Sequence, residues 1–348
     1  MTPLLAALAG DAEVEALFTG AADVAAMLRF EAALAGAQAG AGVIPHEHAD
    51  AIARACASFT PDWPELCADM ARDGVAIPGL LRQVRRMLGA EASGSLHKGA
   101  TSQDAIDTSL VLRLAELLDI LDVRLALLGD ALASLAARDG ALPIMAQTRM
   151  QQALPFTVAD KVAAWLQPLL RHRARLAQLR PRLLLVQLGG PVGDRASLGP
   201  QAADIAADLA QRLGLAAAPA WHAQRDAIAE LGGWLALVCG SLGKFGQDLA
   251  LMSQNGIAAV RLAGGGGSSA MAHKHNPVRA EVLVALARYA AGLSGTLAQA
   301  MVHENERSGA AWTLEWLTLP PLATAAAASL RLALALTSDL TFLQTARA

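Results

Sequence analysis

The stretch from Ala105 to Arg138 reads AIDTSLVLRLAELLDILDVRLALLGDALASLAAR, and it decides the fold that we expect. Its leucines and other apolar residues recur at the spacing of a helix, and no proline interrupts them. Ordinary globular helices run about 8–20 residues, so a segment of this length predicts a bundle of long helices. Similar apolar-periodic segments follow at 157–188, 201–213, 226–254, 278–303 and 312–345.

The composition of the 348-residue chain favours helices throughout. Apolar residues make up 54% of the chain, alanine and leucine dominate, and aromatic residues amount to only 4%. Because these are strong helix formers and β-branched clusters are scarce, we expect an all-α protein. A polar, glycine-punctuated loop precedes Asp104, so we expect an N-terminal helical domain over residues 1–103 and the long-helix bundle over 104–348.

Charge and hydropathy argue against several classes of protein. A net charge of −3 gives no basic surface for nucleic acid. The most membrane-like stretch, 231–251, is interrupted by Lys244 and Asp248, so a buried bundle helix explains it better than a membrane span. Three cysteines without metal spacing, and an N-terminus without a secretory signal, predict a cytoplasmic protein that acts on a metabolite.

Three polar segments interrupt the apolar background, and each lies at the end of a predicted helix. They read HKGATSQDAIDT at 97–108, QTRMQQALP at 147–155 and GGGGSSAMAHKHNP at 264–277. Their hydroxyls, amides and cations are groups that bind carboxylates. In a bundle of long antiparallel helices such segments can converge, within one subunit or between subunits.

The third segment has the features of an anion site. Its four glycines permit a mobile backbone, and two serines and Lys274 follow them. Asn276 and Pro277 have the form of a helix start, with Asn as the N-cap and Pro at the first helical position. Free N–H groups at such a start favour a bound anion. The alternative is a plain glycine linker between two helices.

The polar side chains also have ordinary structural explanations. Thr101 and Ser102 can cap the helix that follows them, and His97 can simply face solvent. Thr148 and Gln151 can hydrogen bond to neighbouring backbone in a bend before the next proline. These alternatives stand beside the functional interpretation at each position.

Motifs for metals and cofactors are weak in this sequence. The HKH pattern at 273–275 lacks the i, i+4 histidine spacing of helical metal sites, and no cysteine or acidic partner lies close by. The GGGG run follows no predicted strand and lacks the G-x-G-x-x-G spacing of a dinucleotide site. We therefore expect no metal and no other cofactor.

Together the three segments resemble those of the fumarase/aspartase superfamily, whose members carry a GSSxMPxKxNP loop. Here that loop reads GSSAMAHKHNP at 267–277, and the resemblance covers nearly the whole chain. It implies a long-helix bundle of the fumarase/aspartase type. Because the chain stops soon after the segment 312–345, we expect the C-terminal domain of the superfamily to be largely absent.

Within the superfamily, the chain is most similar to the bacterial 3-carboxy-cis,cis-muconate cycloisomerase family. Stretches that match this family include LGGPVGD at 188–194, WHAQRDAIAEL at 221–231 and ERSGAAWTLEWLTLP at 306–320. The resemblance implies lactonisation of 3-carboxy-cis,cis-muconate to a carboxymuconolactone, in protocatechuate catabolism by the β-ketoadipate pathway. Superfamily reactions pass through an aci-carboxylate intermediate, whose doubled negative charge requires fixed donors.

The resemblance also implies roles for individual residues. Ser268 matches the serine of proton transfer, and His97 is a second candidate for that role or for carboxylate binding. Lys274 and Asn276 match residues that hold the substrate carboxylate at the catalytic centre. The other implied substrate-binding residues are Thr101, Ser102, Thr148, Gln151, Arg225 and Ser269.

Departures from the superfamily pattern favour one reaction over another. Thr148 is followed by Arg149, where many fumarate-releasing lyases carry the histidine that acts as general acid. An adenylosuccinate or argininosuccinate lyase needs that acid to protonate an amine leaving group, so it is the weaker alternative. An intramolecular carboxylate nucleophile needs no such acid. A non-catalytic structural bundle is the other alternative, and Ser268, Lys274 and Asn276 argue against it.

We expect a homotetramer whose active sites are shared between subunits and take a small dicarboxylate or tricarboxylate. Only 17% of residues are charged, which indicates helices buried on several sides, as in an oligomer. Neither nucleic acid nor a membrane is an expected partner. Further departures from the superfamily pattern, without an assigned effect, are Ala272, His275 and Asn305.

Overall fold

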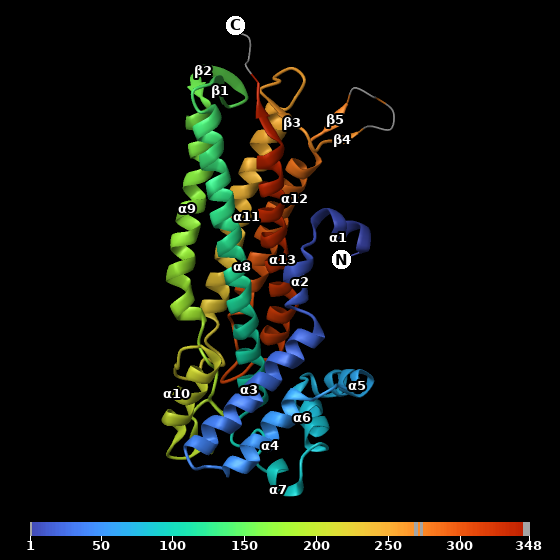
Figure 1. Ribbon diagram of the computed structural model, residues 1–348, viewed down its shortest axis with the longest axis vertical. Coiled ribbons are helices and arrows are strands. Elements are labelled where there is room, and N and C mark those ends of the chain that lie inside the picture. Colours follow the sequence, from blue (N-terminus) through green and yellow to red (C-terminus); the bar gives the residue numbers. More distant parts are fainter. Residues whose placement is uncertain (1, 268–270, 272–273, 344–348) are drawn as a thin grey trace.

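The computed structural model describes residues 2–267, 271 and 274–343, and its long helices confirm the predicted all-α class (Figure 1). The helices are α1 Pro3–Ala9, α2 Ala12–Ala16, α3 Gly20–Gly40, α4 His46–Ala57, α5 Trp63–Asp73, α6 Ile77–Arg85, α7 Ala90–Ser93, α8 Ser102–Asp139, α9 Val158–Leu183, α10 Ala202–Leu213, α11 Asp226–Met252, α12 Val278–Gln299 and α13 Gly309–Asp339, with the 3-10 helix η1 at Ala196–Leu198. The strands are β1 Pro143–Thr148, β2 Gln151–Thr157, β3 Val260–Leu262, β4 Gly266–Gly267, β5 His275–Asn276 and β6 Leu340–Phe342.

The long helices α8, α9, α11, α12 and α13 run side by side along the molecule (Figure 1). Helix α8 has 38 residues, so it is about 57 Å long at a rise of about 1.5 Å per residue. Its side chains Leu114, Leu117 and Leu121 are fully buried in the core that these helices share. Their spacing of three and four residues places them on one stripe, so the apolar period read from the sequence is the buried face of the helix.

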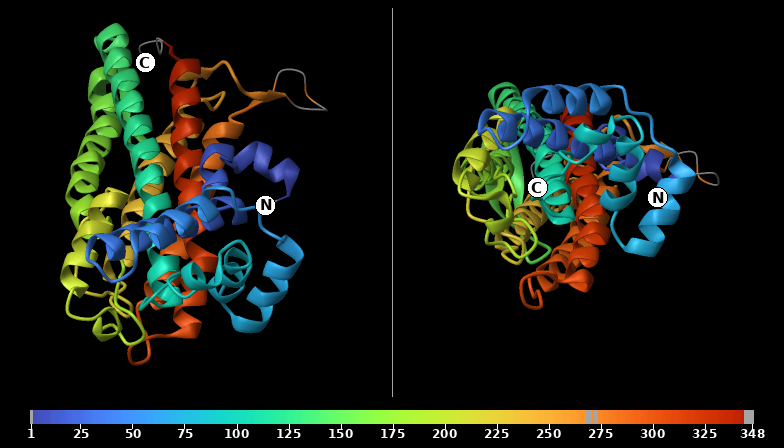
Figure 2. Two further views of the ribbon diagram at one scale, coloured as in Figure 1. Left: turned by 60° about the horizontal axis from the view of Figure 1, so that its bottom comes forward. Right: turned by 90° about the horizontal axis from the view of Figure 1, so that it is seen from below.

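A second, smaller core lies at the lower end of the bundle in Figure 1, where α3 to α7 and α10 gather. Helix α3 crosses the long helices there, as the left view of Figure 2 shows. The core includes Phe30, Leu80 and Leu209, all fully buried. Because it also takes in residues of α10 and of the start of α8, it extends beyond residues 1–103. The domain boundary before Asp104 stays a prediction.

The upper end of the bundle carries short strands that the sequence did not indicate. Strands β1 and β2 form an antiparallel hairpin between α8 and α9, with Thr148 paired to Gln151. Arg149 and Met150 make its turn at φ values of 48° and 65°, the left-handed conformation of two-residue hairpin loops. Such loops normally use Asn and Gly, so an Arg-Met turn gives little sign of itself in the sequence. Strand β3 pairs with β6, and β4 pairs with β5.

Two helices are long and apolar enough to cross a membrane by length and composition alone, namely Asp226–Met252 and Gly309–Asp339. Of the most apolar window, 56% is buried inside the protein in the first helix and 72% in the second. Core helices of a bundle have the same property. In α11, Asp248 also forms ion pairs with Lys161 and Lys244, which joins α11 to α9. The sequence had singled out only the first of these two helices.

The buried stripe of α8 yields a test of the fold. We expect Leu121→Ala to lower the free energy of unfolding by about 2–5 kcal/mol, because it removes buried methyl groups and leaves a cavity. Leu127, on the same helix but 53% exposed, is the matched control, and Leu127→Ala should change stability by about 0.5 kcal/mol or less. Urea unfolding at one fixed protein concentration measures both. Equal losses in the two variants would contradict the assigned face.

Candidate active site

The predicted site residues lie at two opposite ends of the bundle. Thr101 and Ser102 are at the start of α8, at the lower end, whereas Thr148 is in the hairpin at the upper end (Figure 1). The whole of α8, about 57 Å long, separates them. One chain therefore keeps the first polar segment far from the second and third.

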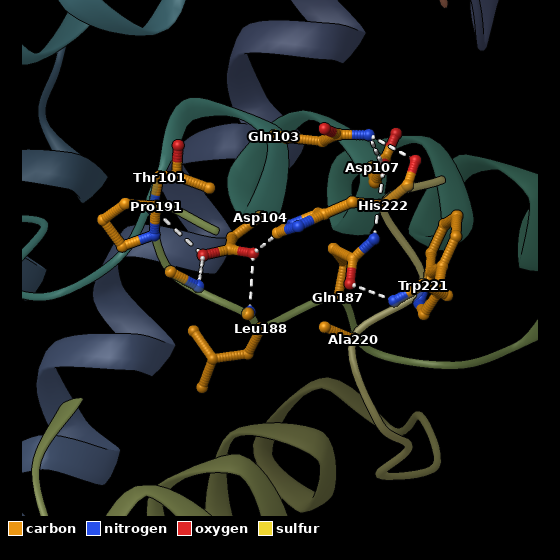
Figure 3. Close-up of polar contacts among 12 residues, drawn as sticks. Thr101, Gln103, Asp104, Asp107, Gln187, Leu188, Pro191, Ala220, Trp221 and His222 are labelled. Carbon is orange, nitrogen blue, oxygen red and sulfur yellow. Dashed lines mark hydrogen bonds and ion pairs between the residues drawn. The ribbon is translucent and has the colours of Figure 1, made fainter. Parts of the chain in front are cut away.

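Asp104 fixes the start of α8, and Figure 3 shows its surroundings. Its fully buried carboxylate accepts hydrogen bonds from the backbone N–H groups of Thr101, Gly189 and Gly190, at 2.8–3.0 Å. His222 Nε2 adds a fourth, at 2.8 Å. Four donors match the acceptor capacity of a carboxylate, so this charge is buried without an unmet hydrogen bond. Thr101 is the N-cap, and Ser102 is already the first helical residue.

One turn further along α8, Asp107 is buried with Arg225 and Glu315. Arg225 donates to the two oxygens of Asp107 at 2.7 and 3.1 Å, and its Nε donates to Glu315 at 3.0 Å. Burial alone would lower the pKa of Arg225, but the two carboxylates outweigh it and hold that pKa above its ordinary value. Burial raises the pKa of Glu315.

This geometry gives Arg225 a structural role. The side chain is 2% exposed, and the ring of Trp221 lies 4.8 Å from its guanidinium carbon. Because its donors face Asp107 and Glu315, the expected contact between Arg225 and a substrate finds no support here. Arg225 instead ties the start of α11 to α8 and α13. Sequence reasoning missed the two carboxylates, although each is an acidic residue within an apolar helix.

His97 lies beside the same end of the bundle and does not face solvent freely. Its side chain is 11% exposed, and Nδ1 lies 2.6 Å from Oε1 of the buried Glu31. Burial alone would lower the pKa of His97, but the charge and hydrogen bond of Glu31 outweigh it, so the pKa is raised. The backbone of His97 is left-handed, with φ of 61°. The sequence offered no pairing between these two residues, which are 66 positions apart.

At the upper end, Thr148 and Gln151 are exposed and face each other across the hairpin. Neither side chain hydrogen bonds to any residue in the described part of the chain, so both are available to a ligand. Lys274 is also exposed. Asn276 lies in β5, and α12 begins only at Val278, so the predicted N-cap role of Asn276 was wrong.

Ser268 and Ser269, like the departure at Ala272, lie outside the described residues. The strands on either side of them are paired, Gly266 with Asn276 and Gly267 with His275. Across the ranges 2–267 and 274–343, no three His, Cys, Asp or Glu side chains form a group that could hold a metal ion.

The long-helix bundle with polar segments at both ends defines a lyase-type enzyme. A model of the lyase family matches residues 12–292, so the chain belongs to that family. The resemblance to the fumarase/aspartase superfamily is thereby confirmed.

Particular relatives narrow the comparison. The chain is 44% identical over 336 residues to the 3-carboxy-cis,cis-muconate cycloisomerase of Pseudomonas aeruginosa. The aligned region covers 94% of this chain and 73% of that protein. The 3-carboxy-cis,cis-muconate lactonizing enzyme of Pseudomonas putida superposes with a TM-score of 0.93 at 39% identity, covering 98% of this chain and 77% of that one. A fumarate lyase from Mesorhizobium sp. BNC1 superposes with a TM-score of 0.90 at 34% identity, covering 96% and 76%.

The buried charges at the lower end yield a prediction about stability. Arg225→Met should lower the free energy of unfolding by about 3–5 kcal/mol, because it strands the Asp107 and Glu315 carboxylates in the core. This loss in the free energy of unfolding should be smaller at pH 5 than at pH 8, because the carboxylates left without a counter-ion take up protons at the lower pH. Arg182→Met, which breaks an exposed pair with Glu230, is the control and should cost about 1 kcal/mol or less. Similar losses in the two variants would refute the assignment of Arg225 as a buried counter-ion.

Proposed function

We propose that this chain is a cycloisomerase that lactonises 3-carboxy-cis,cis-muconate to a carboxymuconolactone. The observation that carries the proposal is the 44% identity over 94% of the chain to an enzyme of that name, with the serine-containing loop at 267–277 retained. The reaction would serve protocatechuate catabolism in the cytoplasm. It involves no net oxidation or reduction, because it only redistributes bonds within one molecule, and we propose that it proceeds without a cofactor.

The chemistry sets clear demands on the site. One substrate carboxylate attacks a carbon of a double bond, and a C–O bond forms as the π electrons move toward a neighbouring carboxylate. The resulting aci-carboxylate carries a doubled negative charge until its α-carbon takes up a proton. The attacking carboxylate loses its charge as it becomes the lactone ester, and the α-carbon gains one proton from the proton-transfer group, so the product acid is an isomer of the substrate acid. Preorganised donors and cations around the developing charge provide most of the rate enhancement in such reactions.

The residues of the polar segments supply these groups. We assign proton transfer to Ser268 and carboxylate binding to Lys274 and Asn276, with Ser269 beside them. Thr148 and Gln151 add uncharged donors from the hairpin, and neither side chain hydrogen bonds to another of the residues that the structure describes. A serine hydroxyl has a high pKa, so Ser268 needs nearby cations and N–H groups to stabilise its alkoxide.

The remaining groups, His97, Thr101 and Ser102, lie at the other end of the subunit, which leads to the quaternary proposal. Because α8, about 57 Å long, lies between Thr101 and Thr148, a site that includes both requires the lower end of one protomer to meet the upper end of another. We infer a homotetramer with active sites at the junctions between subunits. Arg225 drops out of the substrate-binding set, since it is buried in its own ion pairs.

A lyase that releases fumarate is the second candidate function, and the 34% identity to a fumarate lyase supports it. Arg149 stands where such lyases carry their general acid, and an arginine does not give up a proton at neutral pH. An ultraviolet assay separates the two candidates. Loss of muconate absorbance supports the cycloisomerase, whereas fumarate formation from a succinyl compound supports the lyase.

The serine assignment is tested by Ser268→Ala. We expect kcat for lactonisation to fall by about 10²–10⁴-fold, the usual contribution of a positioned proton-transfer group. Ser253→Ala is the control, because Ser253 ends α11 and its hydroxyl donates only to the Ala250 carbonyl at 3.0 Å. Turnover like that of the wild type in a folded Ser268→Ala protein would remove the serine from the mechanism.

The shared site is tested by mixing two inactive variants. Hybrids of Ser268→Ala with His97→Ala should regain measurable lactonising activity, because some junctions then combine an intact loop with an intact His97. Hybrids of Ser268→Ala with Lys274→Ala should not, since these residues share one loop and hence one protomer. Mass spectrometry verifies that mixed oligomers have formed. No recovery in verified hybrids of the first kind would contradict sites shared between subunits.

A further inference from the structure

Glu31 is a buried carboxylate that the proposed reaction leaves without a role. It lies in the middle of α3, its side chain is 1% exposed, and its Oε1 lies 2.6 Å from Nδ1 of His97. Its other oxygen, Oε2, is buried and has no hydrogen-bond partner in the described structure. A carboxylate is costly to bury unless a charged partner compensates it. The geometry makes His97 that partner.

The backbone of His97 has a left-handed conformation, and hydrogen bonds from two other segments hold the residues that follow it. His97 adopts φ of 61°, a left-handed conformation that side chains other than glycine rarely take. Two turns along α3 from Glu31, Gln38 donates to the carbonyl of Lys98 at 2.6 Å. From the other side, Ser197 donates to the carbonyl of Gly99 at 2.6 Å. A strained residue persists only where its surroundings overdetermine it, and such strain gathers at functional sites.

The charges around this pair favour a protonated imidazole. Asp104 of α8 adds to the effect of Glu31 in raising the pKa of His97, whereas burial and Arg85 of α6 act in the opposite direction, and the net pKa is raised. Cys56 of α4 also faces Glu31, but burial and then the Glu31 charge raise the pKa of that thiol to about 12. The thiol therefore stays neutral, and His97 is the group that balances Glu31.

We propose that Glu31 is a positioning residue that holds His97 as an imidazolium, with Nδ1–H bonded to Glu31 and Nε2–H left to donate to a substrate carboxylate. This inference rests on the proposed function, which places His97 in the site. An imidazolium has no lone pair with which to accept a proton, so His97 does not act as a base in this state. We assign its Nε2–H to carboxylate binding, and we assign donation of the proton to Ser268.

The pH dependence of activity tests the pairing. Substrate binding needs protonated His97, and Glu31 raises the pKa of His97. Wild-type kcat/KM should therefore fall only as the pH rises through that raised pKa, and this decrease at high pH is the alkaline limb of the profile. Glu31→Gln keeps an acceptor oxygen but removes the charge, so the fall in kcat/KM at high pH should begin at a lower pH than in the wild type. The loss should appear mainly as a higher KM, because carboxylate binding is weakened in ground and transition states alike.

A matched control and a double variant separate positioning from general damage. Asp69→Asn removes another buried carboxylate of the N-terminal helices, one paired with Arg72 at 2.7 Å, and should leave the alkaline limb in place. The double variant Glu31→Gln/His97→Gln should be no worse than His97→Gln alone, since Glu31 acts through His97. An alkaline limb that stays put in Glu31→Gln, or additive losses in the double variant, would overturn the proposal.

A second measurement does not depend on the proposed reaction. The titration of His97 can be followed by NMR of ¹³C-labelled histidine, with the resonance assigned by its absence in His97→Gln. We expect a titration above that of a free histidine in the wild type and a lower one in Glu31→Gln. If Glu31→Gln does not fold, Glu31→Asp, which keeps the charge, should retain the raised titration.

The outcomes distinguish the two claims. A wild-type protein without lactonising activity but with a Glu31-dependent His97 titration would refute the proposed function and leave the pairing intact. A His97 titration that is the same with and without the Glu31 charge would overturn the pairing, whatever the enzyme catalyses.

Discussion

Two buried carboxylates three residues apart on α8, Asp104 and Asp107, organise the lower end of the bundle. Asp104 takes hydrogen bonds from the helix start, from the loop at 189–190 and from His222. Asp107 takes Arg225 and also accepts from the indole of Trp312 at 3.1 Å. Each buried charge would be costly alone, but each has its hydrogen bonds satisfied. Segments that lie 85 to 205 positions further along the chain are thereby fixed to the first two turns of one helix.

This anchoring has a consequence for the site. With the lower end fixed to the start of α8, the length of that helix sets the distance to the β1–β2 hairpin. A rigid helix of about 57 Å does not fold back, so its two ends stay apart within one protomer. Sharing sites between subunits lets rigid bundle ends present groups that a single chain keeps apart. In the proposed homotetramer the oligomer would be part of the catalytic apparatus and not only a source of stability.

The sequence predicted the features that repeat locally and missed those that depend on distant partners. Helical period and composition were enough for the long helices, and the three polar segments were recognisable by contrast with their apolar surroundings. The burial of Arg225 was not predictable, because its partners Asp107 and Glu315 lie 118 and 90 positions away. The Arg149-Met150 turn was missed because its residues are atypical of the left-handed conformation they adopt. Acidic residues inside apolar helices, such as Glu31 and Glu315, were the one unused signal.

The number of carboxylates around a buried cation distinguishes Arg225, which is structural, from His97, to which we assign a role in the chemistry. Arg225 directs its donors at two carboxylates and is 2% exposed, so nothing of its charge reaches a ligand. His97 has one carboxylate on one nitrogen, and its side chain remains 11% exposed. Glu31 therefore fixes the ring and its charge without consuming the second nitrogen. A reaction whose intermediate gains negative charge benefits from a cation held in this way, because the donor is oriented before the charge develops. Under the proposed function, proton transfer is left to Ser268, and Glu31 supplies the charge that keeps His97 a donor.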